Sequence, residues 1–195
     1  MGIISNRQSA ADWDADFQLA KSAGIDAFAL NIATDAVDSF TDTQLGYAYE
    51  SAANNGMKVF ISFDYNYWGA GSEAAVGAKV ATYGVKEGQL KIGNKVFVSS
   101  FIGRGALNVD AVRSAASGLE LYVVPNFWPS DEGYGSVDGA FNWAAWPSDG
   151  NNNPPSGTVV SVHDQDNAYV GALGDKAYMA RMLFKFMRYN ALLTR

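Results

Sequence analysis

Polar side chains stand at the ends of several apolar segments. Asp64 directly follows the largely apolar residues 59–63, and Asn31 and Asn126 lie near the ends of two other such segments. Hydrolysis of a glycosidic bond usually needs two carboxyl groups that flank the bond, because one group cannot act as both acid and base. Asp64 is the best candidate for one of these catalytic groups. Its alternative role is to cap the loop or helix that follows.

Aromatic residues continue from the same segment ends. Sugar C–H faces pack on aromatic rings, while amide side chains bond hydroxyl groups. The pattern therefore predicts a carbohydrate-binding cleft, with Asn31 and Asn126 bonding sugar hydroxyls. The alternative is that the rings pack the interior and the amides satisfy backbone groups. The candidate aromatic contacts are Tyr65, Trp68, Trp128, Trp143 and Trp146, with Tyr67 and Phe127 beside them.

The remaining acidic and imidazole groups are weaker candidates. Asp138 precedes an apolar segment, where a turn or cap role is expected, and Asp131 and Glu132 are expected to form a solvated loop. His163 is the single histidine and the chain has no cysteine. The pattern therefore supports neither a metal site nor a Ser-His-Asp triad, and we expect no metal or cofactor.

Helical and strand-like segments alternate along the chain. Near-continuous apolar strands between helices predict a parallel sheet covered by helices. Ser9 is the expected N-cap of the first helix. We expect helices over residues 9–23, 41–55, 73–83, 109–116 and 164–173, and strands over residues 25–32, 58–64, 95–101, 119–126 and 139–143.

Two closures of such a sheet are possible, a doubly wound fold or a barrel. The first strand is not followed by a glycine-rich phosphate loop, which removes the main sign of a nucleotide-binding fold. Polar groups at the strand ends favour a (β/α)8 TIM-type barrel, whose active sites lie at the carboxyl ends of the strands. With residues 1–5 as the stump of a first strand, about six strands are present, so we expect an incomplete, open barrel. Its open strand edges would allow self-association.

Charge and hydropathy exclude some partners. The net charge of −6 argues against nucleic-acid binding, which relies on clustered Lys and Arg. No apolar run approaches the roughly 18 residues of a transmembrane helix. Residues 1–5 also lack the charged and apolar regions of a signal peptide.

The end of the chain has a different composition. From Lys176 onward there are five basic residues and no acidic one. Residues 179–190 predict a basic amphipathic helix, which would lie on an anionic membrane, fill a partner groove or cover the sheet edge. An alternative is that these last residues are translated out of frame, since such a sequence can show an amphipathic pattern by chance. We therefore divide the chain into a partial catalytic barrel, residues 1–180, and a divergent basic tail, residues 181–195.

Six segments together resemble the fungal α-1,3-glucanases, or mutanases, of glycoside hydrolase family 71. The resemblance implies an inverting endo-hydrolase of α-1,3-glucan that is extracellular, acts on fungal cell wall material and uses Asp64 in its site. Order and spacing of the segments are kept from about residue 5 to residue 180. The segments are residues 9–13, 24–32, 58–64, 96–101, 124–127 and 138–147.

The chain also departs from this family. An Asp-Tyr-Gly-Glu-like motif, which the resemblance implies for a later strand, does not occur. We therefore expect a truncated hydrolase that is inactive as this chain. One alternative is a non-catalytic α-glucan-binding protein that uses the aromatic cleft. A third possibility is a membrane-bound or partner-bound protein that attaches through its tail.

Overall fold

The computed structural model describes residues 7–131, 134–143 and 162–180, in which helices and strands largely alternate. The strands are β1 (Ala27–Ile32), β2 (Lys58–Asp64), β3 (Lys91–Ile92), β4 (Lys95–Phe101), β5 (Leu121–Pro125), β6 (Gly139–Asn142) and β7 (Ala177–Ala180). The helices are α1 (Ala11–Ser22), α2 (Thr41–Asn54), α3 (Glu73–Gly84), α4 (Val109–Ala115) and α5 (Val162–Leu173).

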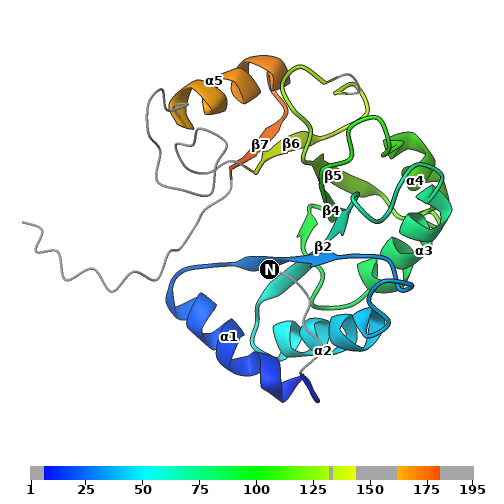
Figure 1. Ribbon diagram of the computed structural model, residues 1–195. Coiled ribbons are helices and arrows are strands. Elements are labelled where there is room, and N and C mark those ends of the chain that lie inside the picture. The colour runs from blue at the N-terminus through cyan, green and yellow to red at the C-terminus, as the bar shows by residue number, and fades with distance from the viewer. Residues whose placement is uncertain (1–6, 132–133, 144–161, 181–195) are drawn as a thin grey trace, which may run out of the picture.

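The sheet is mainly parallel, as predicted. Strands β1, β2, β4 and β5 pair side by side in parallel, and the short β3 adds an antiparallel pair to the start of β4. Strands β6 and β7 form a second parallel pair, and the backbone N–H of Asp138 links it to the carbonyl of Val123 in β5 at 3.0 Å. Figure 1 shows the strands following one another around an open arc with the helices on its outside.

The start of α1 differs from the expected cap. Ala10, not Ser9, occupies the N-cap position, and it makes no side-chain cap hydrogen bond. Instead the carboxylate of Asp12 reaches back and accepts from the backbone N–H groups of Gln8 and Ser9, at 2.7 and 3.0 Å. The first turn is therefore held by an acidic side chain inside the helix, which also suits the positive end of the helix dipole.

The predicted helix over residues 179–190 is wrong at its start. Met179 and Ala180 belong to β7, which pairs with β6 in parallel register. The backbone N–H of Ala177 donates to the carbonyl of Asp138 at 3.0 Å, so pairing between distant segments overrides the local helical pattern. Residues 181–190 lie outside the described residues.

The main core lies between the helices and the outer face of the sheet. Alternate β2 side chains, Val59, Ile61 and Phe63, belong to this cluster. Trp13 and Phe17 of α1 are fully buried in it, as their shared helical face predicts. Burying such side chains contributes roughly 1.5–3 kcal/mol each. The outer face thereby fixes the strands against the helices.

The inner face of the arc, here called the concave face, carries a second cluster made by Phe60, Phe97, Val124 and Phe141. The rings of Phe60 and Phe97 meet edge to face, with centroids 4.7 Å apart. Since side chains alternate along a strand, Asp64 and Phe101 lie on this same face, four residues further along β2 and β4. The concave face is thus apolar in its middle and carries polar and aromatic groups at the carboxyl ends of the strands.

Candidate functional site at the carboxyl ends of the strands

Asp64 is the last residue of β2 and is held at both of its carboxylate oxygens. The side-chain Nδ2 of Asn31 donates to Oδ2 of Asp64 at 3.2 Å. The backbone N–H of Asn66 donates to Oδ1 at 3.0 Å, because the chain turns directly after the strand. Asp64 is half-buried, so its carboxylate is fixed by the protein and still reaches solvent.

A short hydrogen-bond chain orients Asn31. The hydroxyl of Ser62 donates to Oδ1 of Asn31 at 3.2 Å, and these two residues are register partners in β1 and β2. Since the amide oxygen is taken by Ser62, the amide nitrogen faces Asp64. The structure therefore brings together two of the predicted site residues, Asn31 and Asp64.

An aromatic pair stands on the same edge of the sheet. The ring centroids of Phe101 and Trp143 are 4.5 Å apart with their planes tilted by 58°. Trp143 also contacts Phe141 edge to face at 5.8 Å. Both Phe101 and Trp143 are half-buried. Trp143 was among the predicted contacts, whereas Phe101 was not, although it is the register partner of Asp64.

Asn126 lies near this pair but its polar atoms are already used. Its Nδ2 donates to the carbonyl of Phe141 at 2.7 Å, and its Oδ1 accepts from the backbone N–H of Ile102 at 3.3 Å. Only 6% of the residue is exposed. These contacts match the alternative considered for this amide, which is to satisfy backbone groups at strand ends.

Tyr65 and Trp68 follow Asp64 in sequence but turn into the main core. Trp68 is 4% exposed, packs edge to face on Phe63 with centroids 5.2 Å apart, and donates its indole N–H to the carbonyl of Ile32 at 3.1 Å. Burial raises the pKa of Tyr65 to about 12. Their rings therefore offer almost no open surface for a sugar to contact.

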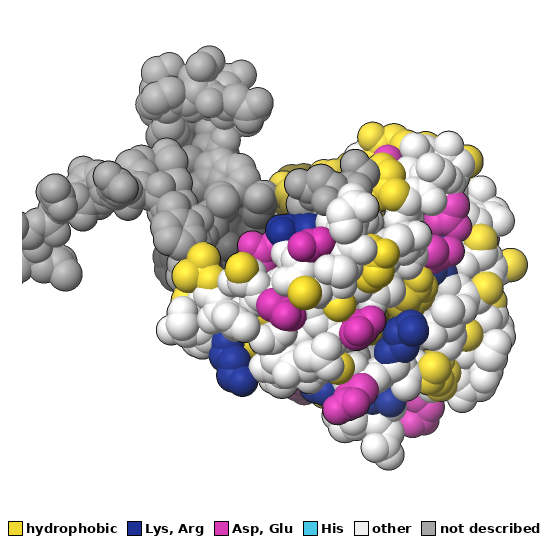
Figure 2. All heavy atoms as spheres, turned by 90° about the horizontal axis from the view of Figure 1, so that it is seen from below, with side chains coloured by type: hydrophobic (Ala, Val, Ile, Leu, Met, Phe, Trp, Pro, Cys, Tyr) yellow, Lys and Arg dark blue, Asp and Glu magenta, His cyan; other side chains and the backbone are white. Residues whose placement is uncertain are grey.

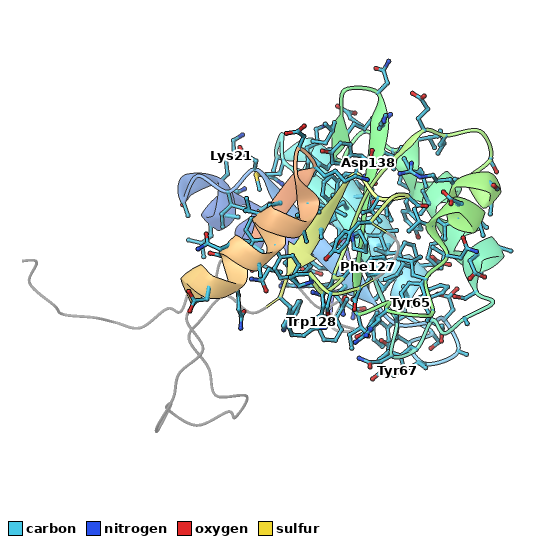
Figure 3. All side chains as sticks on the ribbon, turned by 90° about the horizontal axis from the view of Figure 1, so that it is seen from above. Lys21, Tyr65, Tyr67, Phe127, Trp128 and Asp138 are labelled. Carbon is cyan, nitrogen blue, oxygen red and sulfur yellow. The ribbon has the colours of Figure 1, made fainter. Side chains whose placement is uncertain are left out.

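Two other aromatic residues near this edge are open to solvent. Trp128 and Tyr67 are each about half exposed. Figure 3 shows them at the same end of the sheet as Tyr65, whereas Asp138 lies toward the opposite end. Trp146, the last of the predicted aromatic contacts, lies outside the described residues.

The carboxylate of Asp138 joins α4 to β5, and its contacts are here called the Asp138 clamp. Its Oδ2 accepts from Nη2 of Arg113 at 2.6 Å and from the backbone N–H of Val123 at 2.9 Å. Burial alone would raise the pKa of Asp138, but the hydrogen bonds from Val123 and Arg113 and the nearby positive charges outweigh it and hold the pKa below its ordinary value. These contacts give Asp138 a structural role, but one that joins α4 and β5 and differs from the turn or cap role expected from the sequence.

Asp131 corrects the expectation of a solvated loop. The residue is 8% exposed, and its Oδ2 accepts from the backbone N–H of Trp128 at 2.6 Å. Its Oδ1 lies 2.9 Å from Nε of Arg104. The backbone of its own loop and Arg104 from the loop after β4 together hold this buried carboxylate. Glu132 and the side chain of His163 lie outside the described residues.

The described residues include no group of three or more His, Cys, Asp or Glu side chains placed to hold a metal ion. Across residues 7–131, 134–143 and 162–180, every helix is too short or too polar to span a bilayer. On the face in Figure 2, acidic and basic side chains are interspersed, with no broad basic surface among them.

Two hollows on the surface do not include Asp64 in their lining. One, of about 670 Å³, is lined by the loop after β4, the start of α4 and loop residues after β5. Another, of about 660 Å³, lies between α2 and α3 beside the ion pairs of Lys79. Asn31, Phe101 and Trp143 likewise line neither of these two hollows.

A fixed carboxylate and an aromatic pair at the carboxyl edge of a parallel α/β sheet fit one side of a glycoside hydrolase site, where a pair of carboxyl groups is usual. The chain belongs to glycosyl hydrolase family 71, whose family model matches residues 1–190. This finding confirms the family that the sequence segments resemble.

Curated relatives give the same family. The chain is 40% identical over 184 residues to "Mutanase Pc12g07500" of Penicillium rubens, covering 92% of this chain and 40% of the relative. It is 34% identical over 189 residues to "Glucan endo-1,3-alpha-glucosidase agn1" of Schizosaccharomyces pombe, covering 86% and 43%. An "Ascus wall endo-1,3-alpha-glucanase" of the same yeast is 26% identical over 163 residues, covering 75% and 37%. The chain thus spans about two fifths of the length of the relatives it matches.

A solved structure shares the fold. A "Glycoside hydrolase-like protein" superposes with a TM-score of 0.53 at 17% identity, covering 71% of this chain and 52% of that one. At this identity the likeness concerns the fold alone.

Proposed function

We propose that this chain supplies one side of an endo-α-1,3-glucan hydrolase site, built on an incomplete (β/α)8 barrel. Family membership supports the reaction class, because the relatives are mutanases and endo-1,3-α-glucanases by name. The observation that carries the proposal is the geometry of Asp64, which Asn31 and the turn at Asn66 hold on the concave face beside Phe101 and Trp143.

The barrel part of the proposal is supported by the order of the strands. Strands β1, β2, β4 and β5 neighbour each other in chain order, and β6 and β7 continue the sequence. Helices cover the outside of the arc (Figure 1), and Asn31 and Asp64 meet at the carboxyl edge, where barrel enzymes carry their active sites. The described strands form an open arc, which matches an incomplete barrel.

The hydrogen bonds of Asp64 suit a general base. N–H groups of Asn31 and Asn66 donate to its two oxygens, so the carboxylate is arranged as an acceptor. In an inverting hydrolase the base activates a water, and the acid stands about 6.5–9.5 Å away across the bond. Among the described residues, Asp64 is the carboxylate that the strands bring to the concave edge. The proposed reaction therefore needs an acid from outside the described residues. Because the Asp-Tyr-Gly-Glu-like motif implied by the family resemblance does not occur in the sequence, we expect residues 1–195 alone to release no reducing sugar from α-1,3-glucan.

The proposed substrate is the α-1,3-glucan of fungal cell walls. One relative is named as an ascus wall endo-1,3-α-glucanase, which supports an extracellular place of action. The ring pair of Phe101 and Trp143 would support a sugar face, and the exposed Trp128 would extend this contact. Asn31 would share its amide between Asp64 and a sugar hydroxyl. Trp146 stays a predicted contact.

A chimaera tests the catalytic role of Asp64. Residues 7–180 of this chain would replace the matching segment of the Penicillium rubens mutanase, and reducing sugar released from α-1,3-glucan would be measured. Asp64→Asn removes the base and keeps the shape, so we expect kcat to fall by about 10²- to 10⁴-fold with KM little changed.

Asp26→Asn is the matched control, because Asp26 is an exposed aspartate before β1, at the amino end of the sheet. It should leave kcat unchanged. An Asp64→Asn chimaera that keeps its kcat would contradict a catalytic role for this carboxylate, and turnover by residues 1–195 alone would contradict the need for an external acid.

A second candidate function is α-glucan binding without catalysis. It is favoured by the ring pair, since Phe101 and Trp143 both lie in the described part of the chain and are already in contact. Retention of the 195-residue chain on insoluble α-1,3-glucan would be compared for the wild type, Trp143→Ala and Asp64→Asn. A binding protein predicts loss with Trp143→Ala and retention with Asp64→Asn.

A further inference from the structure

We propose that Asn126 is a positioning residue, which holds Phe101 and Trp143 together as one surface for the sugar. This inference rests on the proposed function, because it concerns how the same edge of the sheet receives a glucan. Asn126 directly follows β5, which lies between β4 and β6. Phe101 is the last residue of β4, and Trp143 directly follows β6.

One amide ties the two neighbouring strands together. Its oxygen accepts from the backbone N–H of Ile102, the residue directly after Phe101, at 3.3 Å. Its nitrogen donates to the carbonyl of Phe141, two residues before Trp143, at 2.7 Å. Each ring is therefore close in the chain to a backbone group that Asn126 holds. The 4.5 Å contact between the rings spans these two anchors.

The backbone at Ile102 needs such an anchor. Ile102 has a φ of +58°, a left-handed conformation that is a genuine outlier for a β-branched residue. Strained residues of this kind persist only where their surroundings fix them. Asn126 holds the N–H of Ile102, and the hydroxyl of Ser100 donates to its carbonyl at 2.6 Å. Without the amide, the turn that follows Phe101 can relax and move the ring.

Asn126 presents little surface to a substrate. Only 6% of the residue is exposed, and its donor and acceptor both bond backbone groups. Unlike Asn31, which stands beside the carboxylate, Asn126 acts through the backbone of its neighbours. A substitution at Asn126 should therefore change the rings first and sugar affinity as a consequence.

The test compares wild-type chain with Asn126→Ala by two measurements. The first is the NMR nuclear Overhauser effect between the ring protons of Phe101 and Trp143, which needs no ligand. The second is calorimetric titration with α-1,3-linked gluco-oligosaccharides. We expect Asn126→Ala to lose the ring-to-ring signal and to raise Kd about tenfold, the size expected for about one lost positioning hydrogen bond.

A control variant that also lowers stability separates loss of ring positioning from general destabilisation of the fold. Val112→Ala removes buried methyl groups from α4, in the main core and away from the concave face. It should lower the melting temperature while leaving the ring-to-ring signal and Kd unchanged. If Val112→Ala weakened both as much as Asn126→Ala, the effect of Asn126 would be general destabilisation.

Ile102→Gly provides the second variant, because glycine adopts a positive φ without strain. We expect the combination of Asn126→Ala and Ile102→Gly to regain thermal stability but not the ring-to-ring signal. Recovery of stability, ring contact and affinity together would overturn the inference. An unchanged signal and Kd in Asn126→Ala would do the same.

The two proposals fail in different ways. If the wild-type chain shows the ring contact, Asn126→Ala loses it, and neither binds oligosaccharide, then the glucan function fails while Asn126 still positions the rings. If the wild type binds oligosaccharide and Asn126→Ala binds equally well, the glucan function survives and the positioning role is rejected.

Discussion

Asn31 and Asn126 both lie at strand ends, but their side chains hydrogen-bond different kinds of group. Asn31 donates to the carboxylate of Asp64, and its own oxygen is oriented by Ser62. Asn126 bonds only backbone groups among its described contacts, at Ile102 and Phe141. At the residue scale, an asparagine at a strand end thus predicts that its amide makes a hydrogen bond. The partner depends on the neighbouring strand and on the turn that follows.

The clamp at Asp138 should make folding stability depend on acid. Its pKa is lower in the folded chain than in an unfolded one, so its contribution is fully present above the unfolded pKa and is lost as the pH falls through the folded value. We expect the free energy of unfolding of the wild type to decline below about pH 4. Asp138→Asn should cost about 1 kcal/mol at neutral pH and make this decline shallower.

Urea unfolding at several pH values between neutrality and strong acid measures this dependence. Asp26→Asn serves as the control, because it replaces an exposed carboxylate near the same amino end of the sheet. The clamp is rejected if Asp138→Asn and wild type lose stability in parallel on acidification.

At the element scale, α3 and α4 pack closely at a single glycine. A Cβ added to Gly77 would lie 2.4 Å from Cβ of Ala115 and 2.7 Å from its carbonyl carbon. Such overpacking costs about 1–3 kcal/mol, which outweighs the roughly 1 kcal/mol gained in helix propensity. We expect Gly77→Ala to lower the free energy of unfolding and the melting temperature.

Gly46 in α2 is the matched control. A Cβ there would meet nothing within 4 Å, so the helix-propensity gain remains. Gly46→Ala should raise the free energy of unfolding by about 0.5–1 kcal/mol in the same denaturation experiment. Equal effects of the two substitutions would mean that the close approach of α3 and α4 is not maintained in solution.

Strands with strong local signals could be predicted from the sequence, and strands made by distant pairing could not. The apolar runs of β2 and β4 end in turn residues, and their predicted bounds match the structure. By contrast, β7 is only four residues long and has no distinctive strand pattern. It forms a strand because it pairs with β6. The two-residue β3 likewise depends on the start of β4.

The candidate site shows the same division. Asp64 could be found from its place after an apolar run, but Phe101 becomes part of the site through the register of β2 with β4, which no single segment reveals. Tyr65 and Trp68 were predicted as sugar contacts because they follow Asp64. The turn after β2 instead sends both rings into the core, and such a turn is not encoded in aromatic spacing.

At the scale of the whole molecule, the arc leaves strand edges and an apolar face to be covered. Among the described residues, β1 pairs only with β2, and β7 pairs only with β6. Open edges of this kind invite pairing with another chain. We expect the 195-residue chain to self-associate, with a sedimentation coefficient that rises with protein concentration. A monomer value that stays constant over a hundredfold concentration range would contradict this expectation.

The central claim is that a glucan contacts the carboxyl ends of the strands, where Asp64, Phe101 and Trp143 meet. The direct measurement is NMR chemical-shift mapping of the 195-residue chain titrated with an α-1,3-linked gluco-oligosaccharide. We predict shifts that concentrate at Asn31, Asp64, Phe101 and Trp143, with Lys21 and Asp138 unaffected toward the opposite end, as Figure 3 shows. Shifts centred on Lys21 and Asp138, or no shifts at saturating oligosaccharide, would contradict the account.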